Sequence, residues 1–334
     1  MDILNALVAF LNFVVVPGFS YGSQLALGAL GLTLIFGILR FSNFAHGDTM
    51  AFGTMWVILI TWWLQSMGIT AGPLPTALLA LPFGIAITCA FTLATDRMVY
   101  RFYRQKKAAS IILVIVSTGV MFIMNGLTRM IIGPEEQSFA DGARFVMTAQ
   151  QFKDMTGLQE GLAIKSTTAI TIVMAAVCVA ALFWFLQKTR TGKSMRAFSD
   201  NEDLALLSGI NPERVVVVTW IIATALAVIA GTLYGLDKSF RPFLYFQLLL
   251  PIAAAAVVGG LGNPLGAIAG GFIIAFSEVF VTYAWKKVVL YLVDVDLAPT
   301  QLLQLLSTDY KFAVSFSILI IVLLFMPTGI FKGK

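Results

Sequence analysis

The sequence predicts an all-α, polytopic membrane protein that crosses the bilayer about eight to ten times. Of its 334 residues, 59% are hydrophobic and only 12% are charged, against roughly half and a quarter in an ordinary soluble domain. The apolar stretches are long and unbroken, as in Ala169 to Leu186 and Val215 to Ala230. A transmembrane β-barrel would show segments of about ten residues with alternating polarity. The pattern therefore favours membrane helices over both a soluble fold and a barrel.

The expected membrane helices follow from the length of these stretches. A helix that crosses about 30 Å of hydrocarbon needs about 20 residues. Leu4–Val16 is predicted as a short or partly inserted helix. Because Met1 to Val16 lacks a cationic leading region and a small-residue cleavage site, we expect no cleavable signal peptide. The expected spans are Tyr21–Leu39, Met50–Met67, Leu74–Leu93, Ile111–Ile131, Ala169–Phe185, Val215–Leu233, Leu265–Phe280 and Phe312–Met326, with Phe243–Val258 as a further candidate.

Loop charge sets the orientation, since cytoplasmic loops carry an excess of Lys and Arg. The connections at residues 96–107 and 188–214 are rich in both residue types, so we predict that they are cytoplasmic. The loop between them, residues 133–165, is richer in acids and is predicted to be periplasmic. The same alternation puts Arg40 and the C-terminal Lys332 to Lys334 inside.

Two features fit this orientation less simply. Lys286 and Lys287 fall outside and form one discordant pair. The segment at residues 294–309 is amphipathic, with leucines along one side, and is predicted to lie in the periplasmic interface. The whole chain, residues 1–334, is interpreted as one transmembrane domain.

A first break in the apolar pattern falls at residues 37–48, where polar groups interrupt a span that resumes at once. A broken helix at membrane depth is tolerated where it is buried in protein or lines an aqueous path. Asn43 and His46 would share a helical face, and Asp48 could cap the next helix. We predict that these three residues belong to the substrate path or gate. For His46, structural hydrogen bonding stays an alternative. No metal role is predicted, since no second His or Cys is near.

A second break falls at residues 257–266, with Gly259, Gly260 and Gly262 around a Gly-Asn-Pro turn. Glycines at positions 262, 266 and 270 leave a groove where another helix can approach closely. We predict that Gly259, Gly260 and Gly262 line the path, with tight packing as the alternative. Ionisable or amide groups within the spans are also candidates for the path. Of these, we single out Asn125 and Glu278, and Glu278 has a packing role as its alternative.

The cytoplasmic segment at residues 188–214 carries an unusual cluster of leucines. A short helix is expected there, capped by Ser199 or Asp200 and ended by Gly209. A solvated loop has little use for exposed leucines, so we predict that this helix docks on a soluble partner. Gly192-Lys193-Ser194 is no phosphate loop, because position 187 is Gln where that motif needs Gly. The residues predicted to mediate the docking are Arg196, Asp200, Glu202, Leu206, Leu207, Gly209 and Ile210.

Several of these stretches resemble one known family. Leu27 to Gly37, running into Asn43 to Gly47, closely resembles the LivH-type permeases of branched-chain amino-acid ABC importers. Gly192 to Ala197 with Leu207 to Asn211 resembles the cytoplasmic coupling segment of that family. Two further stretches match in the same order, and the resemblance covers the chain from about Tyr21 to its end. Residues 133–165 and 294–309 look expanded. The two further stretches are Ala230 to Gly235 and Gly259 to Ala267.

The resemblance implies an ABC importer transmembrane-domain fold in the bacterial inner membrane. It also implies partners: a second related permease, two cytoplasmic ATPases that hold ATP and Mg²⁺, and a periplasmic binding protein. The chain itself is then neither an enzyme nor a cofactor-binding protein. Its surface meets lipid, and no basic face with interleaved aromatics indicates nucleic acid.

The implied function is ATP-driven import of branched-chain amino acids. Urea, short amides and other small organic acids stay open as substrates of the same importer class. An ion-coupled secondary transporter is a second alternative, which would need intramembrane carboxylates such as Glu278. An intramembrane enzyme would need a nucleophile paired with a base or a metal cluster, and a single histidine argues against it.

Overall fold

The computed structural model describes residues 2–141, 144–292 and 303–331. Helices dominate it, and the only sheet among these residues is a two-stranded antiparallel hairpin. The elements are α1 Asp2–Phe10, a π-helical turn Leu11–Val15, α2 Val16–Leu39, α3 His46–Ser66, α4 Ala77–Thr95, a π-helical turn Asp96–Tyr100, α5 Arg101–Gln105, α6 Ser110–Ile132, β1 Phe145–Met147, α7 Ala149–Thr156, β2 Ile164–Lys165, α8 Ser166–Lys188, α9 Arg190–Asp200, α10 Glu202–Leu207, α11 Pro212–Lys238, α12 Pro242–Gly259, α13 Pro264–Thr282, α14 Lys286–Leu290, a 3₁₀ turn Thr308–Tyr310 and α15 Lys311–Phe325.

The number of membrane helices agrees with the prediction of eight to ten. Within the described residues, 8 helical stretches are long and apolar enough to cross a membrane. The helix α3, with 21 residues, is long enough as well but less apolar. It lies among α4, α6, α11 and α12, so its polar residues face protein rather than lipid.

The N-terminal expectation was wrong in one respect. Leu4–Val16 is not a separate short helix, since Asp2–Leu39 forms one continuous helix of 38 residues. At 1.5 Å per residue that is about 57 Å, well beyond the hydrocarbon thickness. A π-helical turn, Leu11–Val15, lies just before Pro17, and the helix continues through both. Local π adjustments can satisfy the backbone group that a proline leaves free.

The helix α2 forms the centre of the molecule. Most of its residues are buried, and it packs against α8, α11, α12 and α13. Its glycines permit the closest of these contacts: a Cβ on Gly22 would lie 2.5 Å from the Phe272 ring of α13. The amphipathic pattern of a surface helix is absent from α2 because it has protein on nearly every side.

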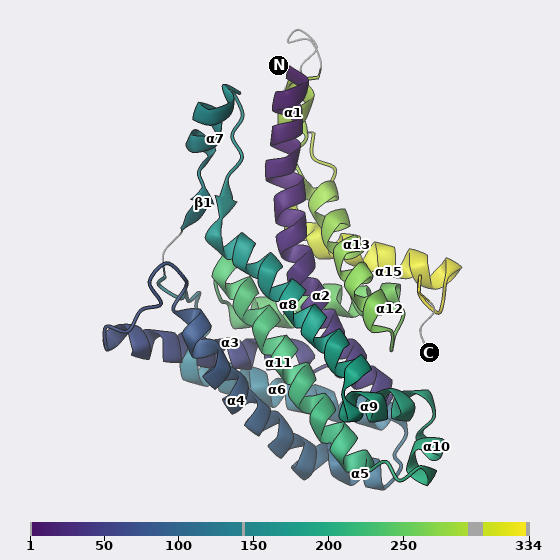
Figure 1. The fold of residues 1–334 in the computed structure, drawn as a ribbon. Coiled ribbons are helices and arrows are strands. Elements are labelled where there is room, and N and C mark those ends of the chain that lie inside the picture. The colour runs from purple at the N-terminus through teal and green to yellow at the C-terminus, as the bar shows by residue number, and fades with distance from the viewer. Residues whose placement is uncertain (1, 142–143, 293–302, 332–334) are drawn as a thin grey trace.

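The loops gather at two ends of the bundle, as the charge alternation requires. The hairpin and α7 lie at one end, and α5, α9 and α10 lie at the other (Figure 1). Arg40 donates a hydrogen bond to the Ser199 carbonyl at the α9 end. Gln137 and Phe240 pair through their backbones at the hairpin end. The basic connections thus share one end, which the positive-inside rule makes cytoplasmic.

One of the two discordant lysines has a structural explanation. Lys287, on α14, forms an ion pair of 2.7 Å with Glu160, which comes from the predicted periplasmic loop. That loop contains the helix α7, which begins with a capping box between Thr148 and Gln151. Of the predicted interfacial segment at residues 294–309, only residues 303–309 are described, and a 3₁₀ turn, Thr308–Tyr310, begins near its end. The C-terminal lysines lie outside the described residues.

Candidate functional site

The predicted first break is present, and it lies deep in the bundle. The helix α2 ends at Arg40, whose φ of 57° is left-handed, and the chain turns back inward before α3 begins at His46. His46 Nε2 lies 2.9 Å from the Gly28 carbonyl oxygen, to which it donates. Gly28 precedes the end of α2 by 11 residues, which is about 16 Å along the helix. The segment from residue 40 to residue 45 is therefore re-entrant.

His46 has the surroundings of a structural side chain. It is 1% exposed. A Cβ on Gly31 would lie 2.8 Å from its ring, so the imidazole occupies a space that only glycine leaves open. The hydrogen bond and the tight fit favour the structural alternative that the sequence left open.

Asn43 and Asp48 are arranged differently from the prediction. Asn43 does not share a helical face with His46, because it lies in the turn before α3, where its Oδ1 accepts from Ala45 N at 3.1 Å. Asp48 is not a helix cap, since it lies inside the first turn of α3 and Ala45 occupies the cap position. The helix begins at residue 46, which is too late to include Asn43 and too early for Asp48 to be its cap.

Two predicted path residues do meet. Asn125 of α6 donates to Asp48 Oδ1 at 2.7 Å. Asp48 is fully buried, and its Oδ2 has no hydrogen-bond partner in the described part of the chain. A buried carboxylate with an unsatisfied oxygen is costly. This pair, between α3 and α6, is the strongest candidate for a group that contacts moving water or substrate.

The second break is a tightly packed helical hairpin. A Cβ on Gly259 would lie 2.0 Å from the Gly266 carbonyl oxygen, and one on Gly270 would lie 2.1 Å from that of Ala255. Gly260 and Gly262 have φ of 106° and 83°, a region that favours glycine. The geometry thus favours the packing alternative for Gly259, Gly260 and Gly262 over a role in the path.

Glu278 has a comparable outcome. It is 1% exposed and accepts a hydrogen bond from Ser315 of α15. The helix α15 is otherwise mostly exposed, with only Val314 and Ser315 buried. Glu278 therefore ties this peripheral helix to α13 through one oxygen, while its Oε2 has no hydrogen-bond partner among the described residues. Its role in the path stays a prediction.

The predicted coupling segment forms two helices, α9 and α10. The cap of α10 was predicted wrongly: Asn201, rather than Ser199 or Asp200, accepts from the Leu204 N–H. Gly209 ends the helix as predicted, with a φ of 79°. The leucines are open to solvent, at 60% exposed for Leu204, 42% for Leu206 and 85% for Leu207. Such a cluster on a helix of six residues is an unpartnered apolar surface.

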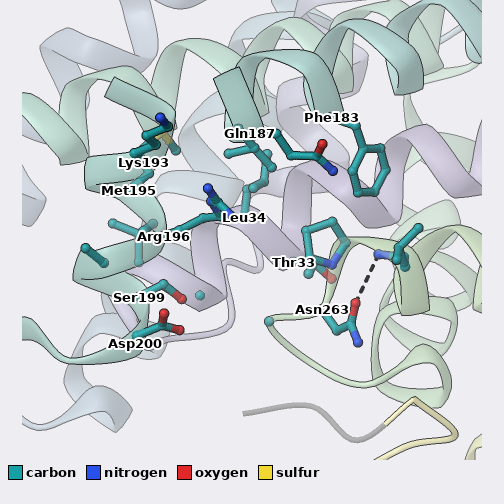
Figure 2. Close-up of a pocket in the computed structure, with 17 residues that line it drawn as sticks. Thr33, Leu34, Phe183, Gln187, Lys193, Met195, Arg196, Ser199, Asp200 and Asn263 are labelled. Carbon is teal, nitrogen blue, oxygen red and sulfur yellow. Dashed lines mark hydrogen bonds between the residues drawn. The ribbon is translucent and has the colours of Figure 1, made fainter. Parts of the chain in front are cut away.

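A crevice of about 620 Å³ joins this segment to the second break. Arg196 and Asp200 of α9 form one wall, and Gly262 and Asn263 form the opposite wall. Figure 2 shows Thr33 and Leu34 of α2 between the two walls, with Gln187 of α8 above them. Two residues predicted for coupling and one predicted for the path thus line the same space at the cytoplasmic end. Glu202, Leu206, Leu207, Gly209 and Ile210 are not among the residues that line it.

Sequence reasoning missed a polar network beside the first break. Asp96, assigned to a cytoplasmic connection, has a side chain only 3% exposed. It accepts from Arg104 at 2.8 Å and from Trp220 Nε1 of α11 at 2.9 Å. Arg104 also lies 3.5 Å from Glu213. The signal was a lone acid at the start of a cationic run, directly after a span.

An aromatic stack joins this network to the re-entrant turn. Tyr100, in the π-helical turn, has its ring centroid 5.3 Å from that of Trp220 and 5.5 Å from that of Phe41. Its hydroxyl lies 3.5 Å from Asn43 Oδ1. Contacts therefore run without a gap from Glu213, just after the coupling helices, to Asn43 in the break.

The periplasmic ends of α6 and α12 are also tied together. Glu136 accepts hydrogen bonds from Ser239 and Arg241. These bonds and the nearby Arg241 charge lower the pKa of Glu136. The carboxylate therefore stays ionised and the tie stays intact at neutral pH.

The re-entrant turn, the exposed leucines of α10 and the two-ended arrangement of charge fit a multi-pass inner-membrane transport subunit. Residues 14–323 match the family described as branched-chain amino acid transport system, permease component, and the chain belongs to that family. It is 32% identical over 320 residues to the high-affinity branched-chain amino acid transport system permease protein LivH of Escherichia coli, covering 94% of this chain and 92% of that one. It is 28% identical over 316 residues to the permease protein BraD of Pseudomonas aeruginosa, covering 94% of each.

Proposed function

We propose that this chain is the permease subunit of an importer that moves branched-chain amino acids across the inner membrane, driven by ATP that partner subunits hydrolyse. Family membership supports the substrate class. The partners in the proposal are a second permease, two cytoplasmic ATPases that hold ATP and Mg²⁺, and a periplasmic binding protein.

The observation that carries the proposal is the exposed apolar surface of α10 at the basic end. Leu204, Leu206 and Leu207 are too exposed to stabilise the chain by itself, and they lie on the side that the cationic loops assign to the cytoplasm. A soluble ATPase that buries them would gain binding energy, and its motion would be coupled to α9 and α10 through the same contact.

Two sets of contacts lead from this docking surface on α10 into the helix bundle. One is the crevice wall, where Arg196 and Asp200 face the α12–α13 turn. The other is the network from Glu213 through Arg104 and Asp96 to the re-entrant turn. In the proposed cycle, ATPase closure displaces α10, and these two contacts transmit the displacement to the path, which opens to one side at a time.

Reconstitution tests the proposal. The permease pair is reconstituted with its ATPases in proteoliposomes, and the binding protein is added on the opposite side of the membrane. The proteoliposomes should transport L-leucine, L-isoleucine or L-valine only when ATP and Mg²⁺ are present on the side that carries the ATPases. Accumulation of urea or short amides instead would overturn the substrate class. Uptake that needs no ATP and stops with an ionophore would favour the secondary transporter, for which Asp48 and Glu278 are two of the buried carboxylates.

A further inference from the structure

A second cavity, of about 420 Å³, opens at the periplasmic end of the bundle. It lies where the first turn of α8 meets the last turn of α11, whose upper ends lie side by side in Figure 1. Its walls combine apolar groups, Pro75, Phe139 and Leu236, with charged residues of both signs. The volume is in the range that small-molecule sites have.

Two of its four charged residues are engaged within the chain. Asp141 accepts hydrogen bonds from Gln65 and from the Thr76 N–H at 3.0 Å, so it holds the start of α4. Arg144 donates to two backbone carbonyls, those of Gly72 and Leu74, in the loop between α3 and α4. These two side chains therefore hold the cavity walls in place, and their polar groups are already occupied by the chain.

The other two charges are poorly matched to the chain around them. Lys165 directly precedes α8, where the helix dipole disfavours a cation. Asp237 is in the last turn of α11, where the dipole disfavours an anion. The Asp237 side chain is only 10% exposed, and its one ion pair in the described chain is with its neighbour Lys238 at 3.8 Å.

The backbone at both helix ends adds to this polarity. No side chain caps α8, and while the Ser166 N–H bonds to the Arg144 carbonyl, the N–H groups of Thr167 and Thr168 have no acceptor within the helix. The carbonyls of the last turn of α11 are orphaned in the same way. One side of the cavity therefore suits an anion and the other suits a cation.

We propose that this cavity holds an α-amino acid as it enters the transporter, with the carboxylate at Lys165 and the start of α8, and the ammonium at Asp237 and the end of α11. The apolar side chain lies against Phe139 and Leu236. A zwitterion relieves both unfavourable charge placements together, which a single ion cannot do. The inference rests on the proposed function for its substrate class and adds a substrate site on the permease itself.

Photolabelling tests the site on the whole transporter in nanodiscs, without the binding protein. A diazirine analogue of leucine should label residues 138–141 and 236–239, and L-leucine should protect them. Leucinamide, which lacks the carboxylate, and 4-methylpentanoate, which lacks the ammonium, should not protect. This comparison uses the unmodified protein, so it does not depend on how any variant folds.

Variants then assign the charges. Lys165→Gln and Asp237→Asn should each raise the leucine concentration needed for protection by roughly tenfold or more, as loss of a charge-assisted hydrogen bond predicts. Lys153→Gln and Asp154→Asn, on α7 and outside the cavity lining, are matched controls that should leave it unchanged.

Three results would overturn the site: label confined to other regions, equal protection by leucinamide or 4-methylpentanoate, or equal behaviour of variants and controls. The proposed function is judged separately, by ATP-driven uptake with the binding protein present. Intact uptake without labelling of the cavity removes only the site. Absence of branched-chain amino acid uptake removes the function on which the site rests.

Discussion

Truncating Leu207 should weaken the hold of the ATPase subunits on this chain. The side chain is 85% exposed, and complete burial of a leucine contributes about 1.5–3 kcal/mol. Covering the exposed part in a partner is therefore worth roughly 1.3–2.5 kcal/mol, so Leu207→Ala should weaken binding by about 10- to 70-fold. Leu207→Asp should weaken it further, because the charge would be desolvated.

The assay is the dissociation constant of the ATPase subunits for the permease pair in nanodiscs, with ATP-driven uptake measured on the same preparations. The melting temperature should not change, because Leu207 contributes little to the isolated chain. Met155→Ala is the matched control, since Met155 is 81% exposed but lies on α7 at the opposite end. An unchanged dissociation constant for Leu207→Ala would refute the assignment of α10 as the docking helix.

Three further outcomes follow from the geometry. A cysteine at Lys193 should resist an impermeant thiol reagent in intact cells, and one at Asp141 should react; the reverse pattern would invert the topology. His46→Ala should lower the melting temperature, with loss of a buried hydrogen bond costing about 1–3 kcal/mol; normal stability with failed transport would return His46 to the gate. Gly259→Val should prevent assembly, whereas Gly119→Val, whose Cβ meets nothing within 4 Å, should assemble normally on size-exclusion chromatography.

The membrane helices were predictable because hydropathy acts locally. Each span is set by its own composition, so the expected ranges agree with the observed helices at most positions. The N-terminal helix was the exception, since nothing in Leu4–Val16 shows that a π-helical turn lets the helix run on through Pro17. Helix ends were less predictable. Asp200 and Asn201 are neighbours of similar capping strength, so the sequence does not show that Asn201 is the one that caps α10.

The roles of single residues were less accessible, because they depend on what other elements bring near them. The structural alternative for His46 gains support only once Gly28 and Gly31 of α2 are seen against it. Gly259 gives the same sequence signal whether it lines a path or touches Gly266, and only the 2.0 Å approach separates the two. The meeting of Asp48 with Asn125 joins helices 77 residues apart, which no local pattern encodes.

The placement of Asp96 constrains how the bundle can move. A carboxylate with a side chain 3% exposed is stable only while its donors stay in reach, and breaking such a buried pair costs about 3–5 kcal/mol. Its donors come from α5 and α11, so those elements and the end of α4 must move together. The stack through Tyr100 adds the re-entrant turn to the same body. A displacement of α10 therefore cannot be absorbed there. The open space is the 620 Å³ crevice between α9 and the α12–α13 turn, so closure of that crevice is the motion that a push from the ATPase side would drive.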